Sequence, residues 1–312
     1  MEAPNKKPYH LPSDAVWFIT GCSSGLGHAL AELVAQTSNR VVATARNVAS
    51  LSSLPDHERV LRLPLDVTSR ESINAAFDAT LERFGRVDVV VNNAGYSLVG
   101  ETEAAGDAES RAQLDTNFWG TVDVTKRALG IMRDVNATNG QQGGVILNIS
   151  SMGGWMGFPG SAFYHASKFA MEGWTEAVAK ELPSSWNIHF SLIEPGGIKT
   201  NYATTSLKVM AKSHPAYADP SFPANVLRAY VTDESCRALW AEPSDVAAAI
   251  YRVTSRGQRI PLRVPLGSDA WGMIATDLDE MKKDLEELKD ISCGVGDEGQ
   301  LDTISFLNTS KA

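Results

Sequence analysis

The chain has few cysteines and no long apolar run, and both absences narrow what it can be. Its three cysteines, Cys22, Cys236 and Cys293, are too few and too scattered for a disulfide framework or a zinc site. We therefore expect reduced thiols and no bound metal. No run of about 18 apolar residues occurs, which argues against a membrane span. The N-terminus "MEAPNKKPYHLPSD" lacks the apolar segment of a signal peptide, so we expect a cytoplasmic protein.

Excess positive charge is also missing. The chain has 28 Lys and Arg residues and 37 Asp and Glu residues, which gives a formal net charge of -9. Nucleic acids and anionic membranes need a basic face, so neither is an expected partner. The 312 residues, 43% of them hydrophobic, are enough to bury a substantial core in a soluble globular protein.

Short β-branched runs alternate with helical patterns along most of the chain. The runs are "AVWFIT", "RVVATAR", "RVLRLPL", "VDVVVNN", "GGVILNIS" and "NIHFSLIEPGG", and the helical patterns begin at Leu26, Ser69, Asp107 and Ala162. Strands this apolar are covered on both faces and lie parallel. The succession predicts a single-domain α/β fold of Rossmann type, a doubly wound parallel sheet with helices on both faces and right-handed crossovers.

The domain is expected to span residues 14–291, between a flexible, proline-containing arm at 1–13 and a polar tail at 292–312. Within it, residues 200–241 mix prolines, lysines and aromatics without a strand pattern, which indicates a lid that faces the substrate. Regular patterns resume with a helix from Pro243, the strand-like "IPLRVPLG", and a charged helix over about 270–290.

A glycine-rich stretch, "TGCSSGLG", follows the first strand and opens the first helix. Glycines here let a pyrophosphate approach backbone N–H groups at the helix N-terminus, where the helix dipole favours anions. Such a turn can be purely structural, but its place after the first strand favours dinucleotide binding. The residues expected to bind are Gly21, Ser23, Ser24, Gly25, Leu26 and Gly27.

The end of the second strand bears on the choice of cofactor. A fold that prefers NAD would place an acidic residue there, whereas this chain has Ala45 and Arg46. A guanidinium pairs well with a 2′-phosphate, so NADP(H) is the expected cofactor. The alternative is that Arg46 is only a solvated residue after a strand.

Two further motifs, "LDV" and "NNAG", end the third and fourth strands, where open α/β sheets bind ligands. They add Asp66, Val67, Asn93, Ala94 and Gly95 to the expected cofactor site. Asp66 has two open interpretations: a hydrogen bond to the adenine amino group, or a cap for the helix that begins near Ser69.

The motifs "TGCSSGLG", "NNAG", "NISS", "YHASK" and "PGGIKT", in this order and at these spacings, resemble the short-chain dehydrogenase/reductase family. The resemblance covers residues 14–200, and more loosely residues up to 267, and it is closest to the NADP-dependent members among fungal and bacterial oxidoreductases. It implies that "PGGIKT" binds the nicotinamide carboxamide, through Pro195, Gly196, Ile198 and above all Thr200.

The stretch "YHASK" places Tyr164 four residues before Lys168, so a helix brings both side chains to one face. An ammonium within about 5 Å favours the phenolate and lowers the pKa of a phenol from about 10. A chance helical pair is the alternative.

The resemblance implies three further roles. Ser151, the second serine of its motif, would hold the substrate oxygen, in preference to Ser150. Lys168 would also bind the nicotinamide ribose. Asn117 would hold a water for a proton relay, although taken alone it would be an ordinary polar helix residue.

Large side chains close to these motifs predict an apolar substrate site formed by Tyr96, Leu98, Ser151, Trp155, Phe158 and Tyr202, with core packing as the alternative. The expected reaction is hydride transfer between NADP(H) and a bulky hydrophobic carbonyl or alcohol, with tyrosine as the general acid/base. One alternative is imine reduction or cyclisation in natural-product (alkaloid or polyketide) biosynthesis. Another is a regulator that binds the cofactor without catalysis.

The helix that carries Tyr164 also presents Phe169, Trp174 and Val178, which do not all share the catalytic face. Apolar groups on an exposed helical face often mark an interface. Members of the family commonly pair through this helix and the preceding one, here residues 114–132, so we expect a homodimer. The alternative is a monomer in which the chain after Thr200, or the charged helix over 281–289, covers that surface.

Overall fold

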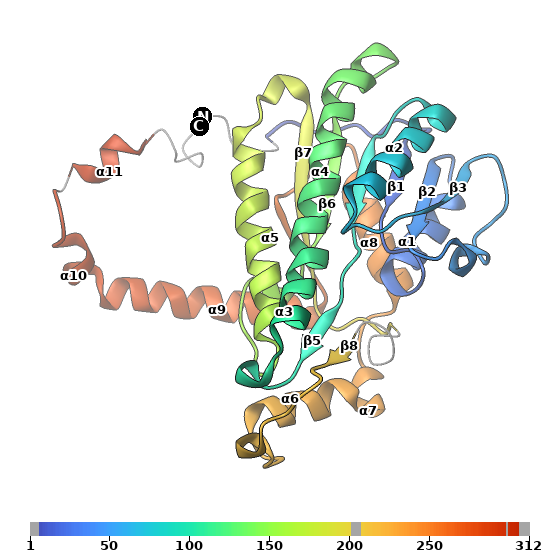
Figure 1. The fold of residues 1–312 in the computed structure, drawn as a ribbon. Helices are drawn as coiled ribbons and strands as arrows, with labels where there is room; N and C mark the ends of the chain where they lie inside the picture. The colour runs from blue at the N-terminus through green and yellow to red at the C-terminus, as the bar shows by residue number, and fades with distance from the viewer. Residues whose placement is uncertain (1–5, 201–206, 298, 306–312) are drawn as a thin grey trace.

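A seven-stranded parallel sheet forms the centre of the computed structural model, which describes residues 6–200, 207–297 and 299–305 (Figure 1). The strand order is β3-β2-β1-β4-β6-β7-β9, and it reverses direction between β1 and β4. The strands are β1 Val16–Ile19, β2 Arg40–Ala45, β3 Val60–Pro64, β4 Val89–Asn92, β6 Gly144–Ile149, β7 Ile188–Pro195 and β9 Arg263–Leu266. The predicted doubly wound α/β fold is confirmed.

Helices cover both faces of this sheet because its strands are apolar on both sides. Along β1, Trp17 and Ile19 pack with α1 (Gly25–Ala35) and α8 (Pro243–Ser255), whereas Val16 and Phe18 face the opposite helices. The opposite layer contains α2 Arg70–Phe84, α4 Gly120–Gly130 and α5 Ala162–Glu181. None of the described helices combines the length and the apolar character needed to cross a bilayer.

The helix expected over residues 107–133 is interrupted twice. It consists of α3 (Asp107–Leu114), a π-helical turn (Asp115–Trp119), α4, and a second π-helical turn (Ile131–Val135). Such turns insert an extra residue into a helix and are frequent at functional sites. Here the first turn contains Asn117.

The segment predicted as a lid does contain a strand. β8 (Leu207–Val209) pairs in parallel with β5 (Ser97–Val99), which corrects the expectation of a strandless segment. A strand of three residues is too short to give a recognisable sequence pattern. It is followed by α6 (Pro223–Thr232) and α7 (Glu234–Arg237), and these helices lie beyond β5 and β8 in Figure 1.

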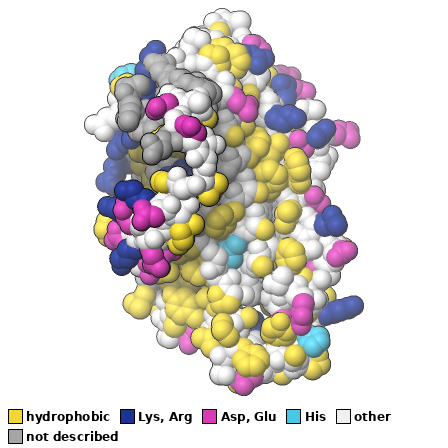
Figure 2. Space-filling model, turned by 90° about the vertical axis from the view of Figure 1, so that its left-hand side faces the viewer, with side chains coloured by type: hydrophobic (Ala, Val, Ile, Leu, Met, Phe, Trp, Pro, Cys, Tyr) yellow, Lys and Arg dark blue, Asp and Glu magenta, His cyan; other side chains and the backbone are white. Residues whose placement is uncertain are grey.

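The remaining elements are short or terminal. The 3₁₀ turns are Val48–Leu51, Thr102–Ala104, Asn136–Thr138, Met152–Gly154, Ser184–Trp186 and Pro215–Tyr217. Towards the end of the described residues lie α9 (Ser268–Glu287), α10 (Lys289–Cys293) and α11 (Gln300–Thr303). The charged helix predicted over 270–290 corresponds to α9 and the start of α10. Figure 1 shows α9 projecting outward from the body. Figure 2 views the molecule from the side on which α9 projects and shows hydrophobic side chains on that surface.

The predicted N-terminal arm is anchored to the body at Tyr9. This side chain is 1% exposed, its ring meets His189 edge-on at 5.1 Å between centroids, and its backbone N–H donates to Gln258 O at 3.3 Å. The segment is thus fixed at Tyr9, and the flexible arm over residues 1–13 otherwise stays a prediction.

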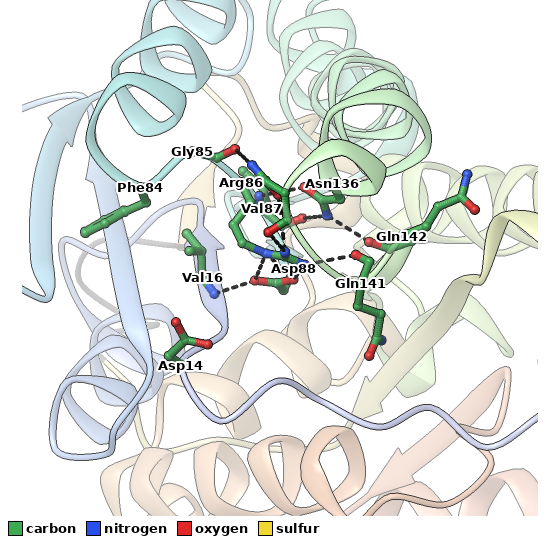
Figure 3. A network of polar contacts seen from close by, with 12 residues as sticks. Asp14, Val16, Phe84, Gly85, Arg86, Val87, Asp88, Asn136, Gln141 and Gln142 are labelled. Carbon is green, nitrogen blue, oxygen red and sulfur yellow. Dashed lines mark hydrogen bonds and ion pairs between the residues drawn. The ribbon is translucent and has the colours of Figure 1, made fainter.

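A buried polar network fixes the start of β4 (Figure 3). The fully buried Asp88 accepts hydrogen bonds from the backbone N–H of Val16 at 2.9 Å and from Nε of Arg86 at 3.0 Å. Asn136 donates to the carbonyl oxygens of Val87 at 2.7 Å and Gly143 at 2.8 Å. The network connects β1, β4 and the turn before β6 at the amino ends of these strands, on the side of the sheet opposite the cofactor motifs.

Candidate active site

The glycine-rich loop joins β1 to α1 and is held against the end of β4. Gly21 (φ +70°) and Gly25 (φ +61°) lie in the left-handed region, which glycine adopts most easily. A Cβ atom at Gly27 would lie 2.4 Å from Nδ2 of Asn93. That amide donates to the carbonyl oxygens of Thr20 at 2.9 Å and Gly21 at 3.1 Å. The "NNAG" motif thus fixes the shape of the loop.

A cavity of about 970 Å³ opens between this loop and α5. Most of the residues predicted to bind the cofactor line it: Gly21, Ser23, Ser24, Gly25, Leu26, Arg46, Asp66, Val67, Asn93, Ala94, Gly95, Tyr164, Lys168, Pro195, Gly196, Ile198 and Thr200. Gly27 lies behind the loop instead and allows its close packing on Asn93. The cavity lies at the carboxyl ends of the strands and at the reversal of strand order, where ligands bind in folds of this type.

Arg46 and Asp66 stand at one end of this cavity. Both are exposed, and the hydroxyl and backbone N–H groups of Thr68 donate to Asp66 Oδ1 at 2.7 and 2.9 Å. These bonds lower the pKa of the Asp66 carboxyl, and the charge of Arg46 adds a smaller effect. The cap of α2 is Ser69, whose hydroxyl accepts from Ser72 N at 3.2 Å. Asp66 therefore shapes the preceding turn while its side chain still borders the cavity.

Tyr164 and Lys168 both face the cavity from α5, as their spacing predicts. The Lys168 Nζ atom lies 5.7 Å from the centre of the Tyr164 ring and donates to Ile149 O at 2.7 Å. Burial lowers the pKa of Lys168 to about 8, and the charge of Glu172 works in the opposite direction. The ammonium is thus held beside the phenol by the end of β6.

Ser151 follows β6 and also lines the cavity. Its Oγ atom accepts a hydrogen bond from Gly153 N at 3.0 Å, which leaves the hydroxyl proton available to a ligand. Ser150 lines the cavity too, but its side chain is almost fully buried.

Asn117 lies behind the cavity wall rather than in it. The fully buried amide accepts from Tyr96 N at 3.1 Å and donates to Tyr96 O at 2.9 Å and to the Ser167 hydroxyl at 3.1 Å. Ser167 in turn donates to Tyr164 O at 2.6 Å. Asn117 therefore connects the segment after β4 to the turn of α5 that carries the tyrosine and the lysine.

The predicted substrate residues divide into three groups. Tyr96, Ser151 and Phe158 line the cavity. Leu98 and Trp155 do not line it: Leu98 alternates along β5 with the cavity-lining Ser97 and is 1% exposed, and the Trp155 ring lies against the Arg263 guanidinium at 5.4 Å. Their contact with a substrate stays a prediction. Tyr202 lies outside the described residues.

Several lining residues were not predicted. Leu227, Tyr230 and Val231 are on α6, Trp240 follows α7, and Met273 is on α9. The first three have the i, i+3, i+4 spacing of one helical face, a signal that the sequence does contain. These apolar side chains support the lid interpretation for the described part of residues 200–241.

His165 was also missed, and it fixes the loop that carries Phe158. Phe158 N donates to the Nε2 atom of His165 at 3.0 Å, so the proton of the neutral ring is on Nδ1, which lies 2.8 Å from Gly153 O. Burial lowers the pKa of His165 and keeps it in this neutral form.

Comparison with known proteins identifies the family to which this fold and cavity belong. The family model for short chain dehydrogenases matches residues 15–210, and the chain belongs to this family. It is 47% identical over 297 residues to the oxidoreductase calM of Penicillium decumbens, covering 94% of this chain and 96% of that protein.

Two further likenesses cover most of the chain. A 3-ketodihydrosphingosine reductase of Bacteroides thetaiotaomicron is 33% identical, over 80% of this chain and 86% of its own. The crystal structure of a short-chain dehydrogenase from Streptomyces avermitilis superposes with a TM-score of 0.80 at 33% identity, covering 91% of this chain and 99% of that one.

Proposed function

We propose that the chain is an NADP(H)-dependent oxidoreductase that interconverts a bulky hydrophobic carbonyl compound and its alcohol. The observation that carries the proposal is the convergence of Ser151, Tyr164 and Lys168 on one cavity that also contains the glycine-rich loop and Arg46. A pyrophosphate suits the loop because its glycines leave the backbone uncovered at the N-terminus of α1. Arg46 would hold the 2′-phosphate.

The bound nicotinamide would supply or accept the hydride, and the protein's own groups handle the proton and the substrate oxygen. In the reducing direction Tyr164 donates its phenolic proton to the substrate oxygen. The Lys168 ammonium stabilises the phenolate that this transfer leaves, since an opposite charge nearby favours the ionised form.

Two further groups would hold this geometry. The Ser151 hydroxyl donates to the substrate oxygen while its own oxygen is held by Gly153 N. Asn117 keeps the segment at Tyr96 aligned with α5. A hydrogen-bonded water at Asn117 remains part of the proposal.

A bulky hydrophobic substrate is supported by the lid residues that line the cavity, because they are mostly apolar or aromatic. The relative from Bacteroides thetaiotaomicron is named for a keto substrate. Both favour a ketone carried on a large apolar molecule. Its biosynthetic setting is proposed as natural-product metabolism.

The test is a panel of hydrophobic aldehydes, ketones and imines incubated with purified protein and NADPH, with cofactor absorbance and product mass recorded together. The proposal expects one NADPH consumed for each alcohol formed. Product without NADPH loss would show a non-redox step such as cyclisation, and an amine product would show imine reduction. NADPH binding without turnover on any compound would indicate a regulator.

A further inference from the structure

Two buried carboxyl groups lie directly behind the catalytic side chains, and the proposed mechanism does not use them. Glu172 belongs to α5 and Glu194 to the end of β7, and they are 5% and 1% exposed. Glu194 follows the residue of β7 that pairs with the last residue of β6, so it lies next to Ser150. A Cβ atom at Gly154 would meet both the Ser150 hydroxyl and the Glu172 side chain.

The Arg263 guanidinium lies near both buried carboxyl groups and near a third one, Glu176. Arg263 Nε lies 3.2 Å from Glu172 Oε2 and 3.7 Å from Glu194 Oε1, and Arg263 Nη2 lies 2.8 Å from Glu176 Oε2. Glu176 is on the outer, partly exposed side, where Lys180 also pairs with it. Arg263 therefore has close contacts with Glu172 and Glu176, and only a long one with Glu194.

Glu194 cannot easily carry a charge in this position. Within the described part of the chain neither of its carboxyl oxygens meets a hydrogen-bond donor. A buried carboxylate without donors loses its solvation without compensation. Burial raises the pKa values of both carboxyl groups. At Glu172 the Ser150 hydroxyl and Arg263 oppose this effect, whereas at Glu194 the charge of Glu172 adds to it, so Glu194 is the group that holds the proton. A protonated Glu194 has one O–H group to donate, and the Glu172 carboxylate is its neighbour.

Glu172 in turn acts on Lys168. The two residues are four apart on α5 and both point inward. Burial lowers the pKa of Lys168, and the negative charge of Glu172 opposes that effect. The charged or titratable groups around the carboxyl pair are Lys168 and Glu176 from α5 and Arg263 from β9, with the Ser150 hydroxyl facing it from the end of β6.

We propose that Glu172 and Glu194 are positioning residues for Lys168: the protonated Glu194 donates a hydrogen bond to the Glu172 carboxylate, and the ionised Glu172 keeps the lysine ammonium charged at neutral pH. The role of Lys168 itself rests on the proposed function. The carboxyl pair would then extend the catalytic side chains to β7 and β9.

The shared proton can be observed without cofactor or substrate. Infrared spectra of the wild-type protein at pH 7 should contain the carbonyl-stretch band of a protonated carboxyl, and this band should fade as the pH is raised above neutral, because the pKa of Glu194 is raised. Glu194→Gln should abolish the band, whereas the control Glu176→Gln, which changes the partly exposed partner of the same arginine, should retain it. A wild-type spectrum without the band, or a band that survives in Glu194→Gln, would overturn the proposal.

The effect on Lys168 is measured by the affinity for NADPH between pH 6 and 10. Glu172→Gln removes the charge that supports the ammonium, so the alkaline loss of binding should move to lower pH by about one unit. At pH 8 this shift corresponds to roughly fivefold weaker binding than in the wild type. Glu194→Gln keeps a neutral donor to Glu172 and should bind as the wild type does at pH 7.

The infrared and binding experiments distinguish the positioning role of the carboxyl pair from the proposed function. A wild-type protein that does not bind NADPH would contradict the proposed function and leave the infrared result standing. Normal binding with an unshifted profile in Glu172→Gln would contradict the positioning role alone. If Glu172→Gln does not fold, the wild-type and Glu194→Gln spectra still decide whether the shared proton exists.

Discussion

Replacing Arg46 with alanine is the sharpest test of how the cofactor is chosen. Arg46 stands exposed at the end of β2, borders the cavity, and has the charge that partly stabilises the Asp66 carboxylate. A hydrogen bond between a guanidinium and a phosphate contributes about 1.5 to 3 kcal/mol, which corresponds to roughly 10- to 150-fold in affinity. Because the side chain is solvated, we expect the lower end, about tenfold, for NADPH.

NADH lacks the 2′-phosphate, so its affinity should change by less than about twofold in the same variant. The assay is a titration of cofactor fluorescence for both cofactors at fixed ionic strength, since salt screens an exposed charge pair. Arg252→Ala, an exposed arginine on α8, is the matched control and should change neither affinity. An equal loss of NADPH and NADH binding would refute the assignment of Arg46.

Three other predictions concern stability and assembly. Asp88→Ala leaves the buried Arg86 guanidinium without its carboxylate and should lower the free energy of unfolding in urea by about 3 to 5 kcal/mol. The control Asp78→Ala removes an exposed carboxylate and should lower it by less than about 1 kcal/mol. Similar losses in the two variants would contradict the importance of the buried network. Burial lowers the pKa of His189 from 6.5 to about 4, so only the unfolded chain gains a proton as the pH falls below 6.5, and stability should drop by about 2 kcal/mol between pH 7 and 5. His189→Asn should reduce that drop, and an unchanged drop would assign it to other groups. For assembly, Phe169 remains 46% exposed on α5, and light scattering at micromolar concentration should give twice the chain mass of 33.6 kDa; a mass that stays at 33.6 kDa at every concentration would rule the dimer out.

The parts of the fold and site that could be predicted are those with local causes. Continuous apolar runs put apolar side chains on both faces of a strand and so predict a parallel sheet covered by helices. The left-handed backbone at Gly21 and Gly25 favours glycine. Tyr164 and Lys168 share a helical face because of their spacing alone. These features do not depend on which distant segment packs against them.

The parts that could not be predicted depend on contacts between distant segments or on the direction of a side chain. Tyr9 is buried because β7 presents His189 to it, far along the chain. Leu98 points away from the cavity because of its place in the alternation of a three-residue strand. Arg263 reaches Glu172 and Glu194 because β9 pairs with β7, a neighbour relation that no short motif encodes.

Tyr164 is the proposed proton donor, in a cavity that we also propose to bind NADP(H). Its most direct test compares the wild type with Tyr164→Phe, which keeps the ring and removes only the hydroxyl. With any carbonyl compound that the wild type reduces, the variant should lose turnover by about 10²-fold or more, the contribution expected of a general acid, while its affinity for NADPH stays within about twofold. Turnover that survives in the variant at more than about a tenth of the wild-type rate would contradict the account.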